Sequence, residues 1–231
     1  MRWILECRSG PAAEHLAAPA AEHRLVRLLD LTRPAVVLGS SQPEGTIDAG
    51  RAAAAGVDVV RRPSGGGAVL VVPGEAIWAD VFLPAGDPLW SADVGVAFHW
   101  LGRAWAEALA AVGVPARAYE GPMRNTAWSK LVCFAGVGPG EVLDAASGRK
   151  IVGLSQRRTR THARFQCCAL LRWDPAALLA LLAVPHPDSS HPDSRAAKAS
   201  LADLAEVARG AGPDREAALV DAFCDVLTAR F

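Results

Sequence analysis

Residues 57–72 read VDVVRRPSGGGAVLVV, in which two apolar runs flank a polar, glycine-rich centre. The two runs predict strands, and the centre predicts the loop between them. Three successive glycines let a backbone approach a ligand closely and present successive N–H groups to an anion. Arg61 and Arg62, directly before them, would complement a phosphate or a carboxylate. A plain flexible turn is the alternative interpretation, and the spacing matches neither of the common nucleotide-binding glycine motifs.

The spacing of apolar residues predicts strands and helices on both sides of this segment. Strands are expected at 3–7, 24–29, 34–39, 57–61, 68–72, 77–83, 131–134, 141–143, 150–155 and 164–172. The runs 68–72 and 77–83 predict a hairpin that turns at Pro73-Gly74. Helices are expected at 12–23 (interrupted by Pro19), 48–55, 92–113, 175–183, 196–208 and 214–230. This order indicates an α+β fold with a mixed, mostly antiparallel sheet flanked by helices.

The composition indicates a globular protein. The chain has 231 residues, 51% of them hydrophobic, with 24 basic and 24 acidic side chains. This length and apolar content suit one domain (1–231) with a sizeable core and exclude global disorder. A net charge of zero argues against bulk nucleic-acid binding, and no apolar run reaches the ~18 residues of a membrane span. Because Met1 to Cys7 do not read as a secretory signal, we expect a cytoplasmic protein.

The cysteines indicate free thiols in a reducing compartment. There are five of them, an odd number without C-x-x-C spacing: Cys7, Cys133, Cys167, Cys168 and Cys224. This pattern supports neither a disulfide scaffold nor a zinc ribbon, and we expect no metal site. The basic residues are lopsided, with 21 arginines and only three lysines, as a GC-rich genome would also produce.

Three blocks of the sequence resemble one known family. Arg61 to Val69 match the pattern Arg-Arg-x-Ser-Gly-Gly-Gly-Ala-Val of the lipoate–protein ligases and octanoyltransferases, which share their catalytic domain with the biotin–protein ligases. Upstream, residues 37–42 resemble the family's strand-ending Gly-x-x-Gln. Downstream, Gly140-Glu141-Val142 and residues 148–157 resemble its Gly-x-Lys-Ile-x-Gly-x-Ala-Gln-Arg segment. The resemblance implies a biotin/lipoate–protein ligase-type catalytic domain.

The resemblance also implies a reaction, the transfer of a lipoyl or octanoyl group to a lysine of a lipoyl carrier domain. Such carriers belong to 2-oxoacid dehydrogenases or to the glycine cleavage protein. Ligases of the family use ATP and Mg²⁺ to activate lipoate or octanoate as an acyl-adenylate. Transferases need no cofactor, because they take the acyl group from acyl carrier protein, and one branch passes it through an enzyme cysteine. A divergent, non-catalytic paralogue that binds acyl groups or lipoyl domains is a third interpretation.

Two residues are the candidates for the chemistry. Lys150 matches the family lysine, whose ammonium would stabilise the charge that develops on the acyl carbonyl. Cys133 precedes Phe134, as in the cysteine-dependent octanoyltransferases, and it would accept the acyl group, with Lys150 favouring its thiolate. A cysteine packed in an apolar strand is the alternative for Cys133. The favoured interpretation is a Cys133 thioester formed from acyl carrier protein.

The resemblance further implies residues that hold the acyl donor or its adenylate. These are Arg61, Arg62, Ser64, Gly65, Gly66, Gly67, Ala68, Gly39, Gln42 and Gly153.

The chain departs from the family pattern in several places. The family's His-Asp after the glycines is absent, and Gln166-Cys167-Cys168-Ala169 stands where the family often has Gln-His-Gly-Ser. Residues 185–231 read as a helical extension that is too short for the accessory domain of classical ligases. These departures favour a transferase or a split ligase.

A basic cluster follows the lysine segment. It consists of Arg157, Arg158, Arg160 and Arg164. It is either a solvated face or a docking patch for an acidic partner such as acyl carrier protein or a lipoyl domain.

Overall fold

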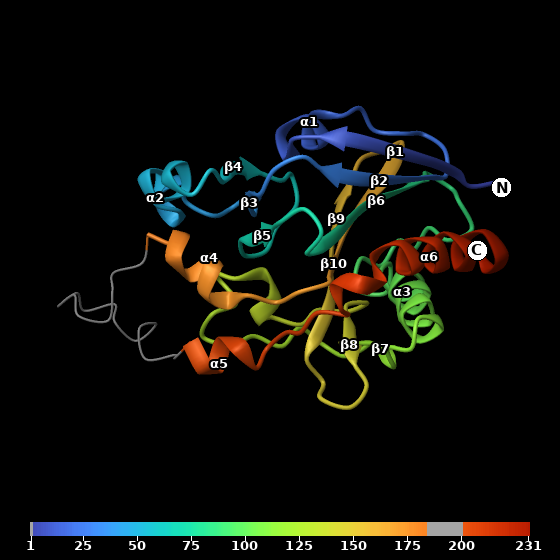
Figure 1. The fold of residues 1–231 in the computed structure, drawn as a ribbon. Helices are drawn as coiled ribbons and strands as arrows, with labels where there is room; N and C mark the ends of the chain where they lie inside the picture. The colour runs from blue at the N-terminus through green and yellow to red at the C-terminus, as the bar shows by residue number, and fades with distance from the viewer. Residues whose placement is uncertain (1, 184–200) are drawn as a thin grey trace.

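The computed structural model describes residues 2–183 and 201–231, and a seven-stranded sheet runs through it (Figure 1). In spatial order its strands are β1 (Ile4–Gly10), β2 (Leu25–Leu31), β6 (Ala76–Pro84), β10 (His162–Leu170), β9 (Lys150–Arg158), β8 (Val142–Asp144) and β7 (Ala116–Ala118). Only β1 and β2 run parallel, and the other neighbouring pairs are antiparallel. The predicted mixed, mostly antiparallel sheet is therefore confirmed.

A second, three-stranded sheet carries the glycine-rich loop. Its central strand β3 (Ala35–Leu38) pairs in parallel with β4 (Asp58–Arg61) and antiparallel with β5 (Val69–Val71). The predicted hairpin is wrong, because β5 joins this sheet whereas β6 joins the large one. Both strands do form, but β6 is buried along nearly its whole length between β2 and β10, and these two neighbours take its ladder hydrogen bonds.

Helices α3 (His99–Ala111) and α6 (Glu216–Arg230) pack against each other beside the large sheet (Figure 1). Their contact centres on Trp105, whose ring stacks on Phe223 with 3.8 Å between centroids. The helix expected at 92–113 begins only at His99. In the preceding segment the carboxylate of Asp93 accepts a hydrogen bond from the backbone N–H of Gly95, which competes with helix formation.

The remaining helices are short. They are α1 (Ala12–Ala17), α2 (Ala49–Ala54), α4 (Pro175–Leu181) and α5 (Leu201–Ala205), with single 3-10 turns at η1 (Glu44–Thr46), η2 (Cys133–Ala135) and η4 (Pro213–Arg215). The start of the helix expected at 196–208 lies outside the described residues. No helix in residues 2–183 or 201–231 has the length and apolar character of a membrane span.

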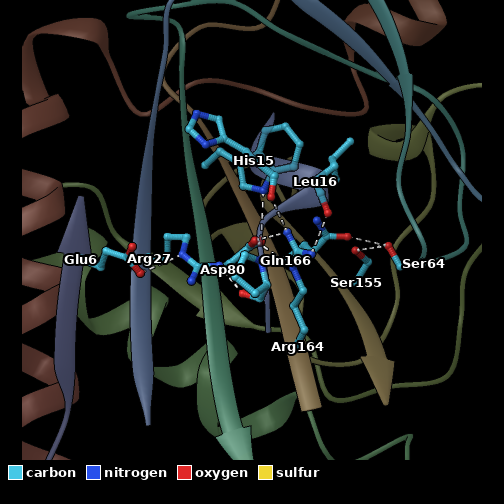
Figure 2. A network of polar contacts seen from close by, with 11 residues as sticks. Glu6, His15, Leu16, Arg27, Ser64, Asp80, Ser155, Arg164 and Gln166 are labelled. Carbon is cyan, nitrogen blue, oxygen red and sulfur yellow. Dashed lines mark hydrogen bonds and ion pairs between the residues drawn. The ribbon is translucent and has the colours of Figure 1, made fainter. Parts of the chain in front are cut away.

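A row of polar side chains crosses the large sheet on the face opposite α3 and α6. The register places Glu6, Arg27, Asp80, Gln166 and Ser155 side by side on β1, β2, β6, β10 and β9 (Figure 2). By contrast, the alternate residues of β6 and β10 pack into the apolar core with α3 and α6. We call these five residues the polar row, and its Gln166–Ser155 end lies below the glycine-rich loop.

Arg164 compensates the buried charge in this row. Its Nε lies 2.8 Å from Asp80 Oδ2, its Nη2 also contacts that oxygen, and its Nη2 and Nη1 donate to the carbonyls of His15 and Leu16 in α1 (Figure 2). Arg164 is therefore not part of an exposed basic cluster, whereas Arg160 is exposed. The interpretation of all four arginines as one surface patch is wrong in this respect.

Replacing Arg164 with alanine should destabilise the fold strongly, because it removes the guanidinium that is hydrogen-bonded to the buried Asp80 carboxylate. We expect a loss of about 3–5 kcal/mol in the free energy of unfolding, measured by urea denaturation. Arg160→Ala, an exposed arginine nearby in the chain, should change it by less than about 0.5 kcal/mol. Equal effects of the two substitutions would contradict this account of Arg164.

Candidate active site

The guanidinium of Arg62 organises the glycine-rich loop from inside. Nη1 donates to the carbonyl of Val37 at 3.0 Å, Nη2 to those of Gly65 and Gly67 at 2.7 and 2.9 Å, and Nε again to Gly65 at 3.2 Å. The side chain is only 4% exposed. Arg62 thus wraps the glycine triplet around itself, and its predicted role in binding a ligand stays a prediction.

Arg61 and Gln42 fix the neighbouring turn. Arg61 Nη1 donates to the carbonyls of Gly39 and Gln42 at 2.8 and 2.7 Å. Gln42 accepts from the N–H of Gly39 at 3.0 Å and donates to the carbonyls of Lys130 and Leu131. A Cβ on Gly39 would lie 1.9 Å from the carbonyl oxygen of Gly66, so this backbone contact requires glycine.

The same loop holds the segment that carries Cys133. Ala68 and the Cys133 segment form two backbone hydrogen bonds, from Ala68 N–H to Leu131 at 2.8 Å and from Cys133 N–H to Ala68 at 2.9 Å. A Cβ on Gly67 would lie 2.6 Å from the carbonyl carbon of Val132 and 2.7 Å from Cys133 N. The glycines therefore bring the loop against Cys133, in addition to any role toward an anion.

Cys133 does not lie in a strand, which corrects the prediction for 131–134. Val132 makes a single bridge with Ala68, and the chain then turns into η2, where Ala135 donates to the carbonyl of Val132. The turn leaves Cys133 half-buried at a pocket wall. Its Sγ lies 4.0 Å from Arg62 Nη2.

Lys150 is buried at the start of β9, with 1% of its surface exposed. Its Nζ pairs with Glu141 Oε1 at 2.7 Å and donates to the carbonyls of Cys133 and Gly136 at 3.1 and 2.9 Å. Gly153 leaves room for the lysine, because a Cβ there would lie 3.3 Å from Lys150 Cε. The ammonium thus faces the backbone of the Cys133 segment.

Glu141 is a site residue for which sequence reasoning predicted no role. Besides binding Lys150, its two oxygens accept from the N–H groups of Leu154 at 3.2 Å and Gly138 at 2.7 Å. A buried lysine needs a counter-charge, so the carboxylate in the Gly140-Glu141-Val142 block was the signal that could have found it.

Ser64 joins the glycine-rich loop to the polar row. Its hydroxyl lies 2.9 Å from the hydroxyl of Ser155 and donates to Gln166 Oε1 at 3.1 Å (Figure 2). Sequence reasoning named Ser64 but gave Ser155 and Gln166 no role in the site. They come together because Gln166 and Ser155 are direct partners in the β10–β9 register.

These residues surround a small pocket, with a cavity volume of about 40 Å³, that opens to solvent. Its apolar wall is formed by Val37, Val69, Val71, Trp78, Phe134 and Leu154. The same lining includes Arg62, Cys133, Ser155, Gln166 and Cys168. An acyl group, apolar along its chain and polar at its carbonyl, would match such a lining.

Two further properties of the pocket bear on its chemistry. Burial raises the pKa of Cys168 to about 12, the neighbouring Cys133 adds to this, and Lys150 and Arg62 oppose it, so Cys168 is a neutral thiol at neutral pH. Within the described residues, the N–H groups of Gly65, Gly66 and Gly67 donate to no acceptor. No hydrogen bond within the described fold therefore occupies these three donors.

A model of the family described as "Lipoyl protein ligase A/B catalytic domain" matches residues 12–231 of the chain. The chain belongs to this family. The fold and family predicted from the three sequence blocks are thereby confirmed, and the protein is a member of a family of lipoate–protein ligase and octanoyltransferase enzymes.

Solved lipoate ligases share the fold of this family member at low sequence identity. A bi-partite lipoate protein ligase from Thermoplasma acidophilum, described with its E2 lipoyl domain, superposes with a TM-score of 0.69 at 19% identity, over 98% of this chain and 84% of that one. A lipoate-protein ligase A bound with ATP gives 0.67 at 18%, over 98% and 86%. LipL1 of P. falciparum, in complex with lipoate, gives 0.64 at 12%, over 98% and 62%. A search of curated proteins found no match.

The close contact at Gly67 can be tested in this lipoyl ligase-family domain by a pair of substitutions. Gly67→Ala should lower the free energy of unfolding by about 1–3 kcal/mol, because the new Cβ overlaps the backbone of Val132 and Cys133. Gly65→Ala is the matched control, since a Cβ there meets nothing within 4 Å, and it should cost under about 0.5 kcal/mol. Chemical denaturation of both variants decides the matter, and equal stabilities would refute the packing argument.

Proposed function

We propose that this enzyme transfers an octanoyl or lipoyl group from a carrier thioester to a lysine of a lipoyl domain, through a thioester on Cys133. The observation that carries the proposal is the position of Cys133. Its thiol lines a pocket with an apolar wall and contacts the Arg62 guanidinium, beside glycine N–H groups that donate to no acceptor in the described chain. A nucleophile and a cation thus line one pocket, next to the glycine-rich loop whose N–H groups would serve as oxyanion donors.

The reaction has two balanced steps. In the first, the Cys133 thiolate attacks the carbonyl carbon of the donor thioester, a new C–S bond forms, and the carrier sulfur leaves as a thiolate that takes a proton. In the second, the neutral amine of the acceptor lysine attacks the acyl carbon on Cys133, an amide forms, and the Cys133 thiolate is released. The proton of the attacking nitrogen passes to solvent.

Different groups around Cys133 would bind the acyl chain and the oxyanion. The acyl chain would lie against the apolar wall, and the N–H groups of Gly65 to Gly67 would bind the oxyanion that forms in each step. Lys150 would reach that oxygen only by giving up one of its present contacts, because Glu141, Cys133 and Gly136 occupy its N–H donors. Its direct binding of the acyl carbonyl thus stays a prediction.

The partners follow from the same chemistry. The proposed donor is acyl carrier protein, and the proposed acceptors are lipoyl carrier domains of 2-oxoacid dehydrogenases or of the glycine cleavage protein. The Thermoplasma acidophilum relative, described with an E2 lipoyl domain, supports an acceptor of this kind. Arg157 and Arg160 are exposed at the β9–β10 end of the sheet and would attract an acidic partner.

ATP-dependent ligation is the second candidate function, and one observation favours it. The three glycine N–H groups would suit a phosphate oxygen as well as an oxyanion. ATP would supply the activation of a free acid, with Arg61 and Arg62 next to the loop. Within the described chain no group of three His, Cys, Asp or Glu side chains could hold a metal ion, so a Mg²⁺ would depend on the nucleotide's own phosphates.

Intact-protein mass spectrometry separates the two functions. Incubation with octanoyl-acyl carrier protein should add an octanoyl mass that hydroxylamine removes, and Cys133→Ala should lose it completely. Cys7→Ala, which removes an exposed thiol in β1, should keep it. If Cys133→Ala modifies a lipoyl domain as fast as the unchanged enzyme when ATP, Mg²⁺ and octanoate are supplied, the protein is a ligase and the proposal is wrong.

A further inference from the structure

We infer that Arg62 is the cation that stabilises the Cys133 thiolate, and that Lys150, paired with Glu141, instead positions the backbone of the Cys133 segment. The inference deepens the proposed function and rests on it for its catalytic meaning. It reverses the expectation from sequence that Lys150 would favour the thiolate.

Arg62 is a buried cation without a carboxylate partner in the described chain. Its hydrogen bonds go to three backbone carbonyl groups and to the sulfur of Cys133, with Nη2 4.0 Å from Sγ. Burying an uncompensated charge is costly, and neutral carbonyl groups offset only part of that cost. A thiolate at Cys133 would supply the missing negative charge, so the two ionised groups would stabilise each other.

Lys150 has no such deficit. Its ammonium forms a 2.7 Å ion pair with Glu141, donates to the carbonyls of Cys133 and Gly136, and lies 4.9 Å from the centroid of the Phe134 ring. No hydrogen bond joins Lys150 to Sγ in the described structure. Because Lys150 binds the carbonyl of Cys133 at the start of η2 and that of Gly136 directly after it, its loss would disturb the position of the Cys133 segment more directly than the charge on sulfur.

The other ionisable groups around Cys133 do not replace Arg62. Glu141 is held by Lys150 and by the N–H groups of Gly138 and Leu154. Cys168, on the neighbouring wall formed by β10, is kept protonated by its burial and adds no charge at neutral pH. Arg62, from the loop after β4, is thus the cation in direct contact with the sulfur.

Gly66 leaves the space in which guanidinium and sulfur meet. Its φ is +100°, a conformation that favours glycine, and a Cβ there would lie 2.8 Å from Arg62 Nη2 and 3.9 Å from Cys133 Sγ. A methyl group at this position would press on the guanidinium without removing any charge. Gly66→Ala therefore tests the placement of Arg62 separately from its presence.

The test is the pH dependence of Cys133 alkylation by iodoacetamide in the free, full-length enzyme, followed by peptide mass spectrometry. Arg62→Gln should slow alkylation at pH 7 about tenfold and move the pH midpoint up by about one unit. Lys150→Gln and Glu141→Gln should leave the midpoint in place, although both should lower the transfer rate. Arg33→Gln, which removes an exposed arginine paired with Asp58, controls for net charge and should change neither quantity. A midpoint that moves in Lys150→Gln but not in Arg62→Gln would overturn the inference.

Gly66→Ala is the second variant for this test. If Arg62→Gln does not fold, as judged by circular dichroism, Gly66→Ala should raise the midpoint in the same direction, and an unchanged midpoint in that variant would refute the inference. The measurement uses no acyl donor, so it is independent of the proposed function. If Cys133→Ala keeps its transfer activity, the proposed thioester mechanism is wrong. The alkylation result would still decide whether Arg62 stabilises the Cys133 thiolate.

Discussion

The site depends on one close approach of two backbones, where Gly67 packs against Val132 and Cys133. No side chain fits between them, because a Cβ on Gly67 would lie 2.6–2.8 Å from three backbone atoms of that segment. The approach allows Ala68 to bind the segment through two hydrogen bonds, and it places Cys133 next to Arg62. The glycine triplet therefore builds the site before it contacts any ligand, and a ligand oxygen can use only the N–H groups that this packing leaves without an acceptor.

Arg164, Lys150 and Arg62 are buried cations near the site, and they are compensated in different ways. Arg164 pairs with the buried carboxylate of Asp80, and Lys150 pairs with that of Glu141. Such pairs contribute little net stability, yet removing one partner is costly, so they define positions more than they strengthen the fold. Arg62 has only carbonyl groups and a thiol. Arg62 therefore differs from Arg164 and Lys150, because it has no carboxylate partner among the described residues.

The local spacing of apolar residues predicted most strands and helices. It could not predict which distant strands pair with one another. The sequence blocks around Gly39, the glycine triplet and Lys150 were sufficient for the family, and the order of expected strands and helices indicated the mixed sheet. The hairpin from β5 to β6 was wrong because two apolar strands joined by Pro73-Gly74 look alike whether they pair with each other or with distant strands. Ser155 and Gln166 gained a role only through the β9–β10 register, which periodicity in one strand cannot specify. The role of Glu141 was not predicted, because it depends on the pairing of β8 with β9, which brings Lys150 next to Glu141.

Cys167 stands where the family often has a histidine, and this change restricts how the proposed reaction can work. Among the described residues that line the pocket there is no histidine and no carboxylate, and Cys168 is held neutral by burial. A general base for the acceptor lysine is therefore missing from the pocket walls. The second step then requires an amine that arrives already neutral, and the rate must come from the electrophile: a thioester carbonyl polarised by the glycine N–H groups. A thiolate paired with Arg62 suits this arrangement, because a stabilised thiolate is also the better leaving group when the amide forms.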